Sequence, residues 1–171
     1  MGYVHDTACS QFIPANAANY VTGTWADAAG VVANTFGKKA SLGDNTATIS
    51  IPVTPIQNSV ANKGAYLTSI DVWFDITGAA VTALDALIYR ATLPADTASI
   101  SAPTSLAFSY DTGHDTAAER DNLDQHKMTL TLTTAIWLDN DDLVSVEIII
   151  DGATSSVVQF HGARANFTLR F

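Results

Sequence analysis

The feature that most constrains the fold of this chain is an alternation of apolar and hydroxyl side chains with a period of two residues. In residues 127–134, Met128, Leu130 and Leu132 alternate with threonines, and residues 46–53 repeat the pattern with Ala, Ile and Val against Thr, Ser and Pro. A period of two places alternate side chains on opposite faces of an extended chain. Both segments are therefore predicted to be half-buried β-strands.

Further segments carry weaker versions of the same signal. The range 143–150 is almost continuously apolar, which predicts a strand covered on both faces. Additional strands are expected at 20–25, 31–38, 66–76, 84–91, 105–110, 156–161 and 163–171, the last two flanking a turn at Gly162. Residues 84–91 would also tolerate a helix. Many short strands separated by Asp, Asn, Gly and Pro predict an all-β, single-domain jelly-roll β-sandwich of about 8–10 strands.

Two segments depart from the strand pattern. Thr116 and Glu119 fit a capping box, which predicts one short helix inside the long polar loop 111–126. Residues 1–45 are poorer in alternation, so we expect an N-terminal extended, loop-rich segment followed by the jelly roll at 46–171. The segment could form an arm that reaches a neighbouring subunit, or a loop-rich edge of the sandwich.

Charge limits the classes of partner. The net charge is −9, and the eight basic residues are scattered, so no basic stripe is available for nucleic acid or for an anionic membrane surface. Only 15% of residues are charged, which is compatible with burial of part of the surface in a homo-oligomer. Cys9 is the only cysteine, which excludes an intramolecular disulfide, and the N-terminal residues do not resemble an export signal.

Two clusters could in principle bind a metal. The turn at 139–142 contains Asp139, Asp141 and Asp142, which are weak calcium candidates, but the twelve-residue calcium loop is absent and a solvated turn explains the sequence. His114 shares a loop with Asp111 and Asp115, and His126 follows, but the spacings of zinc sites are missing. We therefore predict no metal and no cofactor.

Enzymatic signatures are also missing. The sequence contains no Gly-x-Ser-x-Gly elbow, phosphate-binding loop or dinucleotide fingerprint. Its serines and threonines occupy alternating strand positions, where they pack and hydrogen-bond. The prediction is a protein that binds or assembles and is not an enzyme, with no catalytic residues.

Aromatic residues offer candidates for binding. Trp25, Trp73 and Trp137 lie in or beside predicted strands, where they would pack in the core or form a stacking platform for sugar rings. The last residues form an alternating apolar run, in which Phe167, Leu169 and Phe171 are candidates for a subunit interface.

The layout of residues 136–171 resembles the trimeric jelly rolls of the C1q and tumour-necrosis-factor type. Trp137 precedes the acidic turn, which leads into the apolar strand at 143–150 and then into a Gly-containing hairpin and a final aromatic strand. The resemblance implies a homotrimer.

Residues 111–118, followed by 124–132, resemble virion structural proteins of phages and environmental viruses. This resemblance implies a homotrimeric decoration or cement protein that binds the major capsid protein, or other virion proteins, of a bacteriophage. It carries over no catalytic residues, and it places the protein in the virion after synthesis in the host cytoplasm. The alternative is the receptor- or glycan-binding head of a phage fibre.

Overall fold

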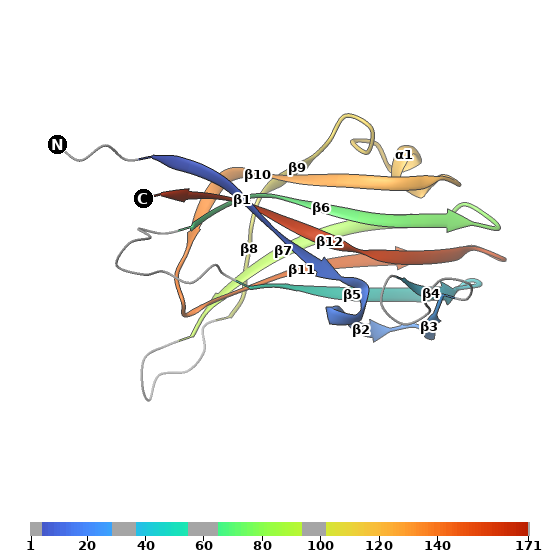
Figure 1. Cartoon of the computed structure of the whole chain (residues 1–171). Helices are drawn as coiled ribbons and strands as arrows, with labels where there is room; N and C mark the ends of the chain where they lie inside the picture. The colour runs from blue at the N-terminus through green and yellow to red at the C-terminus, as the bar shows by residue number, and fades with distance from the viewer. Residues whose placement is uncertain (1–4, 29–36, 55–64, 94–101, 171) are drawn as a thin grey trace.

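The computed structural model describes residues 5–28, 37–54, 65–93 and 102–170. These residues form two antiparallel sheets that pack face to face (Figure 1). In the first, the β6 sheet, the order is β3 (Trp25–Asp27), β4 (Lys38–Ser41), β12 (Val157–Arg170), β6 (Ala65–Thr77), β10 (Gln125–Leu138) and β9 (Phe108–Tyr110), with β1 (Asp6–Pro14) also paired to β12. In the second, the β11 sheet, the order is β2 (Asn19–Thr22), β5 (Thr46–Val53), β11 (Asp142–Asp151), β7 (Ala83–Thr92) and β8 (Thr104–Ser105).

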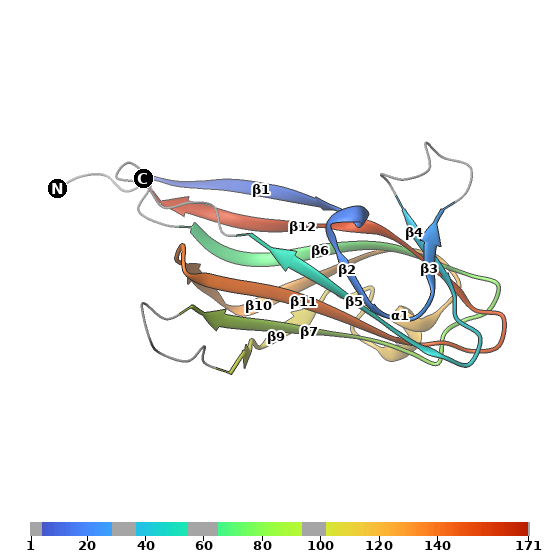
Figure 2. The same cartoon turned by 90° about the horizontal axis from the view of Figure 1, so that it is seen from below.

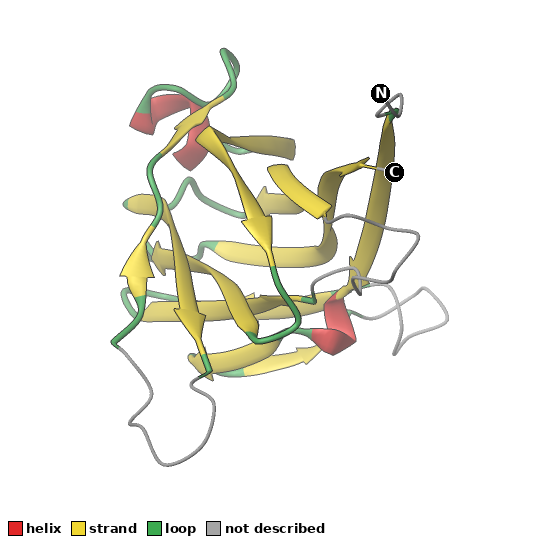
Figure 3. Cartoon of the chain, turned by 90° about the vertical axis from the view of Figure 1, so that its left-hand side faces the viewer, coloured by secondary structure: helices red, strands yellow, loops and turns green. Residues whose placement is uncertain are grey.

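The strand order identifies the architecture. Consecutive long strands alternate between the sheets: β5, β7 and β11 lie in one, and β6, β10 and β12 in the other. The central orders β1–β12–β6–β10 and β5–β11–β7–β8 are those of an eight-stranded jelly roll, in which each hairpin bridges the two layers. Figures 2 and 3 show the two layers from below and from the end at which β1 begins. The predicted jelly-roll β-sandwich is confirmed.

The period-two pattern accounts for the core. On β10, Met128 and Leu130 are fully buried, whereas Thr131 between the apolar positions is exposed. β5 buries its Ala, Ile and Val positions in the same way. Removing each such Leu, Ile or Phe side chain from water stabilises the fold by about 1.5–3 kcal/mol before entropy is counted. The largest fully buried side chains are Phe160, Phe167, Ile49, Ile51, Leu67, Ile70, Ile76, Leu84, Ile88, Met128, Leu130 and Leu138.

Two strand predictions need correction, and a third, the strand at 84–91, is confirmed. The strand at 143–150 is not covered on both faces, because Leu143 is 52% exposed and only alternate residues of β11 are fully buried. Gly162 does not form a turn between two strands: β12 runs through it as one strand with a bulge, where the register with β6 shifts between Phe160 and Gly162. Residues 83–92 form strand β7, so the helical alternative is excluded.

The N-terminal segment belongs to the sandwich. The described part of residues 1–45 supplies β1, β2, β3 and β4, which pair within the two sheets. An arm that reaches a neighbouring subunit stays a prediction. The strands predicted at 20–25 and 105–110 are each divided, into β2 and β3 and into β8 and β9. Most of the strand predicted at 31–38 lies outside the described residues.

In the part of the chain that the structure describes, helical structure is limited to two short elements. A 3₁₀ turn, η1, spans Ala15–Ala17, and α1 spans Ala117–Asp121 in the predicted loop. The carboxylate of Glu119 accepts a hydrogen bond from the backbone N–H of Thr116, as the capping box predicted, and a second one from the Thr116 hydroxyl. Within the described residues, no helix has the length and hydrophobicity needed to cross a bilayer.

Candidate functional site

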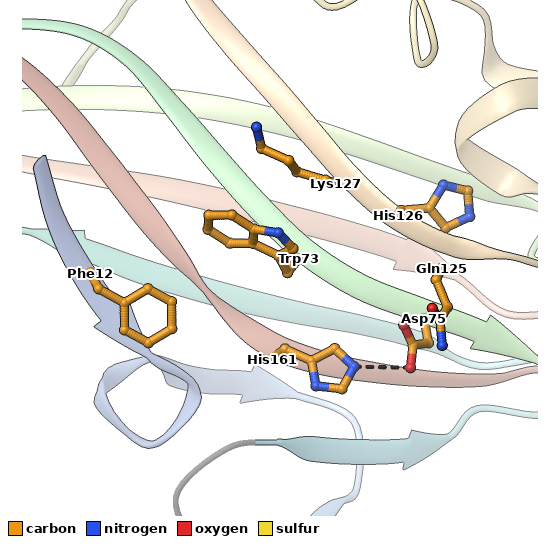
Figure 4. A pocket seen from close by; sticks show the side chains of 7 residues that line it. All are labelled: Phe12, Trp73, Asp75, Gln125, His126, Lys127 and His161. Carbon is orange, nitrogen blue, oxygen red and sulfur yellow. Dashed lines mark hydrogen bonds and ion pairs between the residues drawn. The ribbon is translucent and has the colours of Figure 1, made fainter.

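An open hollow of about 560 Å³ lies on the outer face of the β6 sheet. We call it the Trp73 hollow, and Figure 4 shows the side chains that line it. They come from β1, β6, β10 and β12, which are neighbours in the sheet and far apart in the sequence. The lining residues are Phe12, Trp73, Asp75, Gln125, His126, Lys127 and His161.

The aromatic part of the hollow depends on Gly162. This glycine is the β12 partner of Trp73 on one side and of Pro14 on the other. Its φ is +135°, and a Cβ built on it would lie 2.7 Å from the carbonyl oxygen of Ile13 and 3.0 Å from Cζ of Phe12. The missing side chain therefore leaves room for the Phe12 ring, whose centroid lies 6.2 Å from that of Trp73 at an interplanar angle of 54°.

Cations lie beside the central indole. The guanidinium carbon of Arg164 lies 5.3 Å from the centroid of the Trp73 ring, and Nζ of Lys127 lies 5.9 Å from it. Both distances fall within the range of cation–π attraction. Lys127 is the β10 partner of Trp73, so the sheet register sets this contact. Together the two cations restrict the orientation of the indole.

Asp71 organises the next row of the sheet. Its carboxylate accepts hydrogen bonds from the Thr129 hydroxyl (2.8 Å), the Arg164 Nη2 (2.6 Å) and the Asn166 amide (3.2 Å). Its side chain is 4% exposed, whereas that of Arg164 is 38% exposed. Burial alone would raise the pKa of Asp71, but these hydrogen bonds and the nearby Lys127 ammonium outweigh it, so the pKa lies below its ordinary value. Asp71 is therefore a fixed anion that holds Arg164 beside the indole.

The opposite edge of the hollow contains a second polar pair. His161 is the extra residue of the β12 bulge, and its Nε2 lies 2.9 Å from Oδ2 of Asp75 on β6. A bulge commonly redirects a side chain in this way. Gln125 is the β10 partner of Asp75, so its amide lies beside the pair (Figure 4).

The hollow thus combines aromatic surface with both donors and acceptors. Phe12 is 55% exposed, and the side chains of Lys127, His161 and Asp75 are 51%, 33% and 23% exposed. Such a mixture of apolar surface and convergent polar groups is typical of a ligand site. Asp71 does not fit a general acid, because its low pKa keeps it ionised.

The other tryptophans lie elsewhere. Trp25 packs against the edge of the core, where its ring lies 4.8 Å from that of Tyr20 and its indole N–H donates to the carbonyl of Thr22. Trp137 is 48% exposed near the end of β10, outside the Trp73 hollow. Of the three predicted stacking candidates, Trp73 lies in a hollow with a second aromatic ring, Phe12. Its role in stacking stays a prediction.

The interface candidates also have definite positions. Phe167 is 2% exposed in the core of the chain, so its side chain is not presented on the surface. Leu169 packs half-buried against that core, and Phe171 lies outside the described residues.

The acidic turn at 139–142 has a structural role for its last member. Asp142 accepts two hydrogen bonds from the Arg90 guanidinium, one from the Thr92 hydroxyl and one from the backbone N–H of Asp139. Burial alone would raise its pKa, but the Arg90 guanidinium and the other donors hold the pKa below its ordinary value. Its oxygens are thereby occupied, and among the described residues no group of three or more His, Cys, Asp or Glu side chains is placed to hold a metal ion.

The histidines of the long loop are brought together. His114 and His126 are 8% and 7% exposed, and their facing ring nitrogens lie 3.2 Å apart. Asp111 contacts His114 at 2.8 Å, whereas Asp115 lies at the start of α1 beside Glu119. The sequence placed these residues in one loop but did not reveal that the two imidazoles touch.

Among known proteins, this chain has distant structural neighbours and no match in sequence. No known protein family matches this sequence, and no curated protein sequence matches it. Among solved structures, an arabinose-bound α-L-arabinofuranosidase, MgGH51, aligns over 92% of this chain and 24% of its own, with 12% identity and a TM-score of 0.39. A carbohydrate-binding module of the β-sandwich superfamily aligns over 92% of this chain and 55% of its own, with 15% identity and a TM-score of 0.36.

A third solved structure is similar over most of both chains. The family 11 carbohydrate-binding module from Clostridium thermocellum, in complex with a mixed-linked tetrasaccharide, aligns over 96% of this chain and 89% of its own, with 9% identity and a TM-score of 0.34. This chain spans about a quarter and about half of the length of the first two proteins. All three TM-scores are below 0.5, so the fold of this chain is defined by its own strand order.

Proposed function

We propose that this chain is a non-catalytic glycan-binding domain whose ligand lies in the Trp73 hollow. The observation that carries the proposal is the pairing of Trp73 and Phe12 in an open hollow bordered by hydrogen-bonding side chains. A sugar ring has C–H bonds on its faces and hydroxyl groups around its edge. The first pack on aromatic rings, and the second need partners that both donate and accept.

The polar groups match that requirement. The Gln125 amide and the Lys127 ammonium are donors, and the Asp75 carboxylate and the Gln125 amide oxygen are acceptors at the same edge. In and beside the hollow, the cations Lys127 and Arg164 balance the carboxylates Asp71 and Asp75. This balance favours an uncharged glycan, because the carboxylates would repel an anionic glycan and the two cations would repel a cationic one.

The test is a glycan array of the purified chain, followed by calorimetric titration of the best binder. Trp73→Ala and Phe12→Ala should each weaken binding about tenfold or more, since aromatic contacts contribute about 0.5–1.5 kcal/mol beyond the area that they bury. Trp137→Ala is the matched control, because it removes an exposed tryptophan outside the hollow. Equal losses in Trp73→Ala and Trp137→Ala, or unchanged binding in both hollow variants, would contradict the proposal.

The resemblance to phage virion proteins suggests where such a domain acts. We propose the receptor- or glycan-binding head of a phage fibre, which would bring the Trp73 hollow to glycans on the host surface. Electron micrographs of particles labelled with an antibody against this chain test the location. Label absent from intact particles would exclude it.

A second candidate is the homotrimeric capsid-decoration protein. One observation favours it: the outer face of the β11 sheet carries another hollow, of about 440 Å³, whose lining includes Pro52, Tyr89, Ala91 and the half-exposed Leu143. Stable interfaces commonly bury about 1,200–2,000 Å² in total and have an apolar centre. Light scattering during size-exclusion chromatography should give a trimer. An 18.0 kDa monomer at micromolar concentration would contradict this candidate.

A further inference from the structure

The loop between β9 and β10 is fastened to the sandwich by two buried imidazoles. His126, at the start of β10, stacks on Phe74 of β6 with ring centroids 4.6 Å apart and an interplanar angle of 11°. His114 comes from the far side of the loop and meets it at 3.2 Å between Nε2 and Nδ1. The pair therefore joins the α1-bearing loop to the face of the core.

The two rings form the middle of a chain of three contacts. At one end, Nδ1 of His114 lies 2.8 Å from the carboxylate of Asp111, which also accepts from the backbone N–H groups of Gly113 and Thr129. At the other end, Nε2 of His126 lies 3.2 Å from the carbonyl oxygen of Asn122. Burial would raise the pKa of Asp111, but the hydrogen bonds outweigh it and hold the pKa below its ordinary value. The acceptor at this end of the three contacts is therefore an ionised carboxylate.

The number of protons on the two rings decides whether all three contacts can be hydrogen bonds. Both ends are acceptors, so the three contacts need three protons, one in each. Two neutral imidazoles carry only two N–H protons. One extra proton completes all three contacts and leaves the pair of histidines with a single positive charge opposite Asp111. A second extra proton would place two N–H donors against each other across the 3.2 Å contact between His114 and His126.

We propose that the His114–His126 pair is an acid-sensitive latch, which holds the loop closed with at most one extra proton and releases it when both rings become charged. The closed pair binds at most one extra proton, whereas two solvated histidines of an open loop bind two. Acidification therefore favours opening by mass action.

The surroundings set the pH range. Burial lowers the pKa of His126 from its ordinary value of 6.5, and charge on His114 lowers it further, against the raising effects of the Asn122 carbonyl, Asp124 and Asp75. The other charged groups facing the pair are Asp111, Glu119 and Arg120, whose guanidinium donates to the carbonyl oxygen of His114. The pKa of His126 in the folded chain is depressed. The stabilisation that His126 contributes to the closed loop is therefore present above pH 6.5 and is lost as the pH falls through the pKa of the folded state.

Opening of the loop would also affect one edge of the Trp73 hollow. Gln125 and Lys127 flank His126 on β10, and both line the hollow. The backbone carbonyl of Asp124 also accepts from the N–H of Ile76, which ties the end of the loop to β6. Release of His126 would loosen this edge of the hollow, so we expect acid to weaken a bound glycan. This consequence rests on the proposed function, whereas the latch itself does not.

The test is hydrogen exchange of the full chain without ligand, between pH 7.5 and 4.5 and corrected for intrinsic exchange rates. Below the pKa of an open-loop histidine, the opening equilibrium of residues 111–126 should rise by about tenfold or more per pH unit, because the open loop binds at least one more proton. Amides of β7 and β11 report whether the core stays folded. Unchanged protection of the loop across this range would overturn the latch.

Two variants separate the pair from other causes. In His114→Gln, His126 can donate from both nitrogens, to the new amide oxygen and to the Asn122 carbonyl, so the pH dependence should flatten. His5→Gln, which changes an exposed histidine remote from the loop, should behave as the parent. An equally steep pH dependence in His114→Gln would overturn the latch.

A titration of the parent chain needs no variant. The ¹⁵N shifts of the two imidazoles should report two separate steps, the second displaced to lower pH by the first. Two independent titrations near the ordinary histidine value would overturn the proposal. Because neither measurement uses a ligand, failure of the latch and failure of glycan binding are distinguishable.

Discussion

The outer faces of the two sheets have similar backbones and different chemistry. On the β6 sheet, one carboxylate, Asp71, links side chains of β10 and β12, and an aromatic pair covers the adjacent row. On the β11 sheet, the contact across the strands is a hydroxyl pair, Ser50 and Ser145, at 2.8 Å between their Oγ atoms. Alternation makes both faces, but among the residues that the structure describes only the first carries an interconnected polar network. Substitutions on each face can test this difference.

The largest effect is expected at the backbone beneath the aromatic pair. Gly162→Val forces a side chain onto a φ of +135° and into the carbonyl of Ile13. Strain and overpacking should together cost about 3 kcal/mol in the free energy of unfolding. Urea denaturation measures the loss, with Thr131→Val on the exposed face of β10 as the control. A smaller loss in the free energy of unfolding than in the control would mean that β1 and β12 move apart easily to accommodate the new side chain.

The network itself should give the next largest effect. Asp71→Asn keeps the shape of the side chain but removes the charge that binds Arg164, Thr129 and Asn166. The partly exposed Arg164 can be solvated, so we expect a loss of about 1–2 kcal/mol. Comparison of urea midpoints for parent and variant measures it. An equal loss in Ser145→Ala would remove the distinction between the faces.

Acid should destabilise both sheets through buried carboxylates. The pKa values of Asp71 and Asp142 lie below the ordinary 3.8, so the unfolded chain takes up protons first as the pH falls. Their contribution is fully present above that pH and is lost as the pH falls through the folded values. Asp71→Asn and Asp142→Asn should each reduce the change in unfolding free energy between pH 5 and pH 2. Unchanged pH dependence in both variants would contradict the assignment.

The smallest effect is expected on the β11 face. Ser145→Ala removes one partner of the Ser50 hydroxyl pair, and both side chains are half-buried, so water can replace the lost contact. The free energy of unfolding should fall by about 0.5–1 kcal/mol. Ser50→Ala should give the same value, and the double variant should cost less than the sum of the two.

Local chemistry explains which parts of this fold the sequence could predict. Clean alternation located β5 and β10, a long run of β-branched and aromatic residues located β6, and the Thr116–Glu119 capping box located α1. β1 escaped because its alternation is interrupted, and its place in the sheet comes from pairing with β12. Gly162 was predicted to form a turn because glycine adopts the positive φ that both turns and bulges can require.

The candidate site was less predictable than the fold. Trp73 was one of three equivalent tryptophans in the sequence, and its neighbours Phe12, Lys127 and Arg164 lie on other strands. Register between distant strands decides which side chains meet, and no local pattern encodes it. The nearest signal was the loop sequence around His114 and His126, which grouped two histidines without placing them in contact.

For the glycan ligand that we propose, the tilt between the rings of Phe12 and Trp73 limits the shape that can be bound. Planes inclined at 54° cannot both lie flat against one flat object. A crystalline polysaccharide sheet would therefore rest on a single ring, whereas a single flexible oligosaccharide that bends between two residues could engage both. Discrimination between insoluble and dissolved forms of the same polymer would follow from this corner in the protein surface.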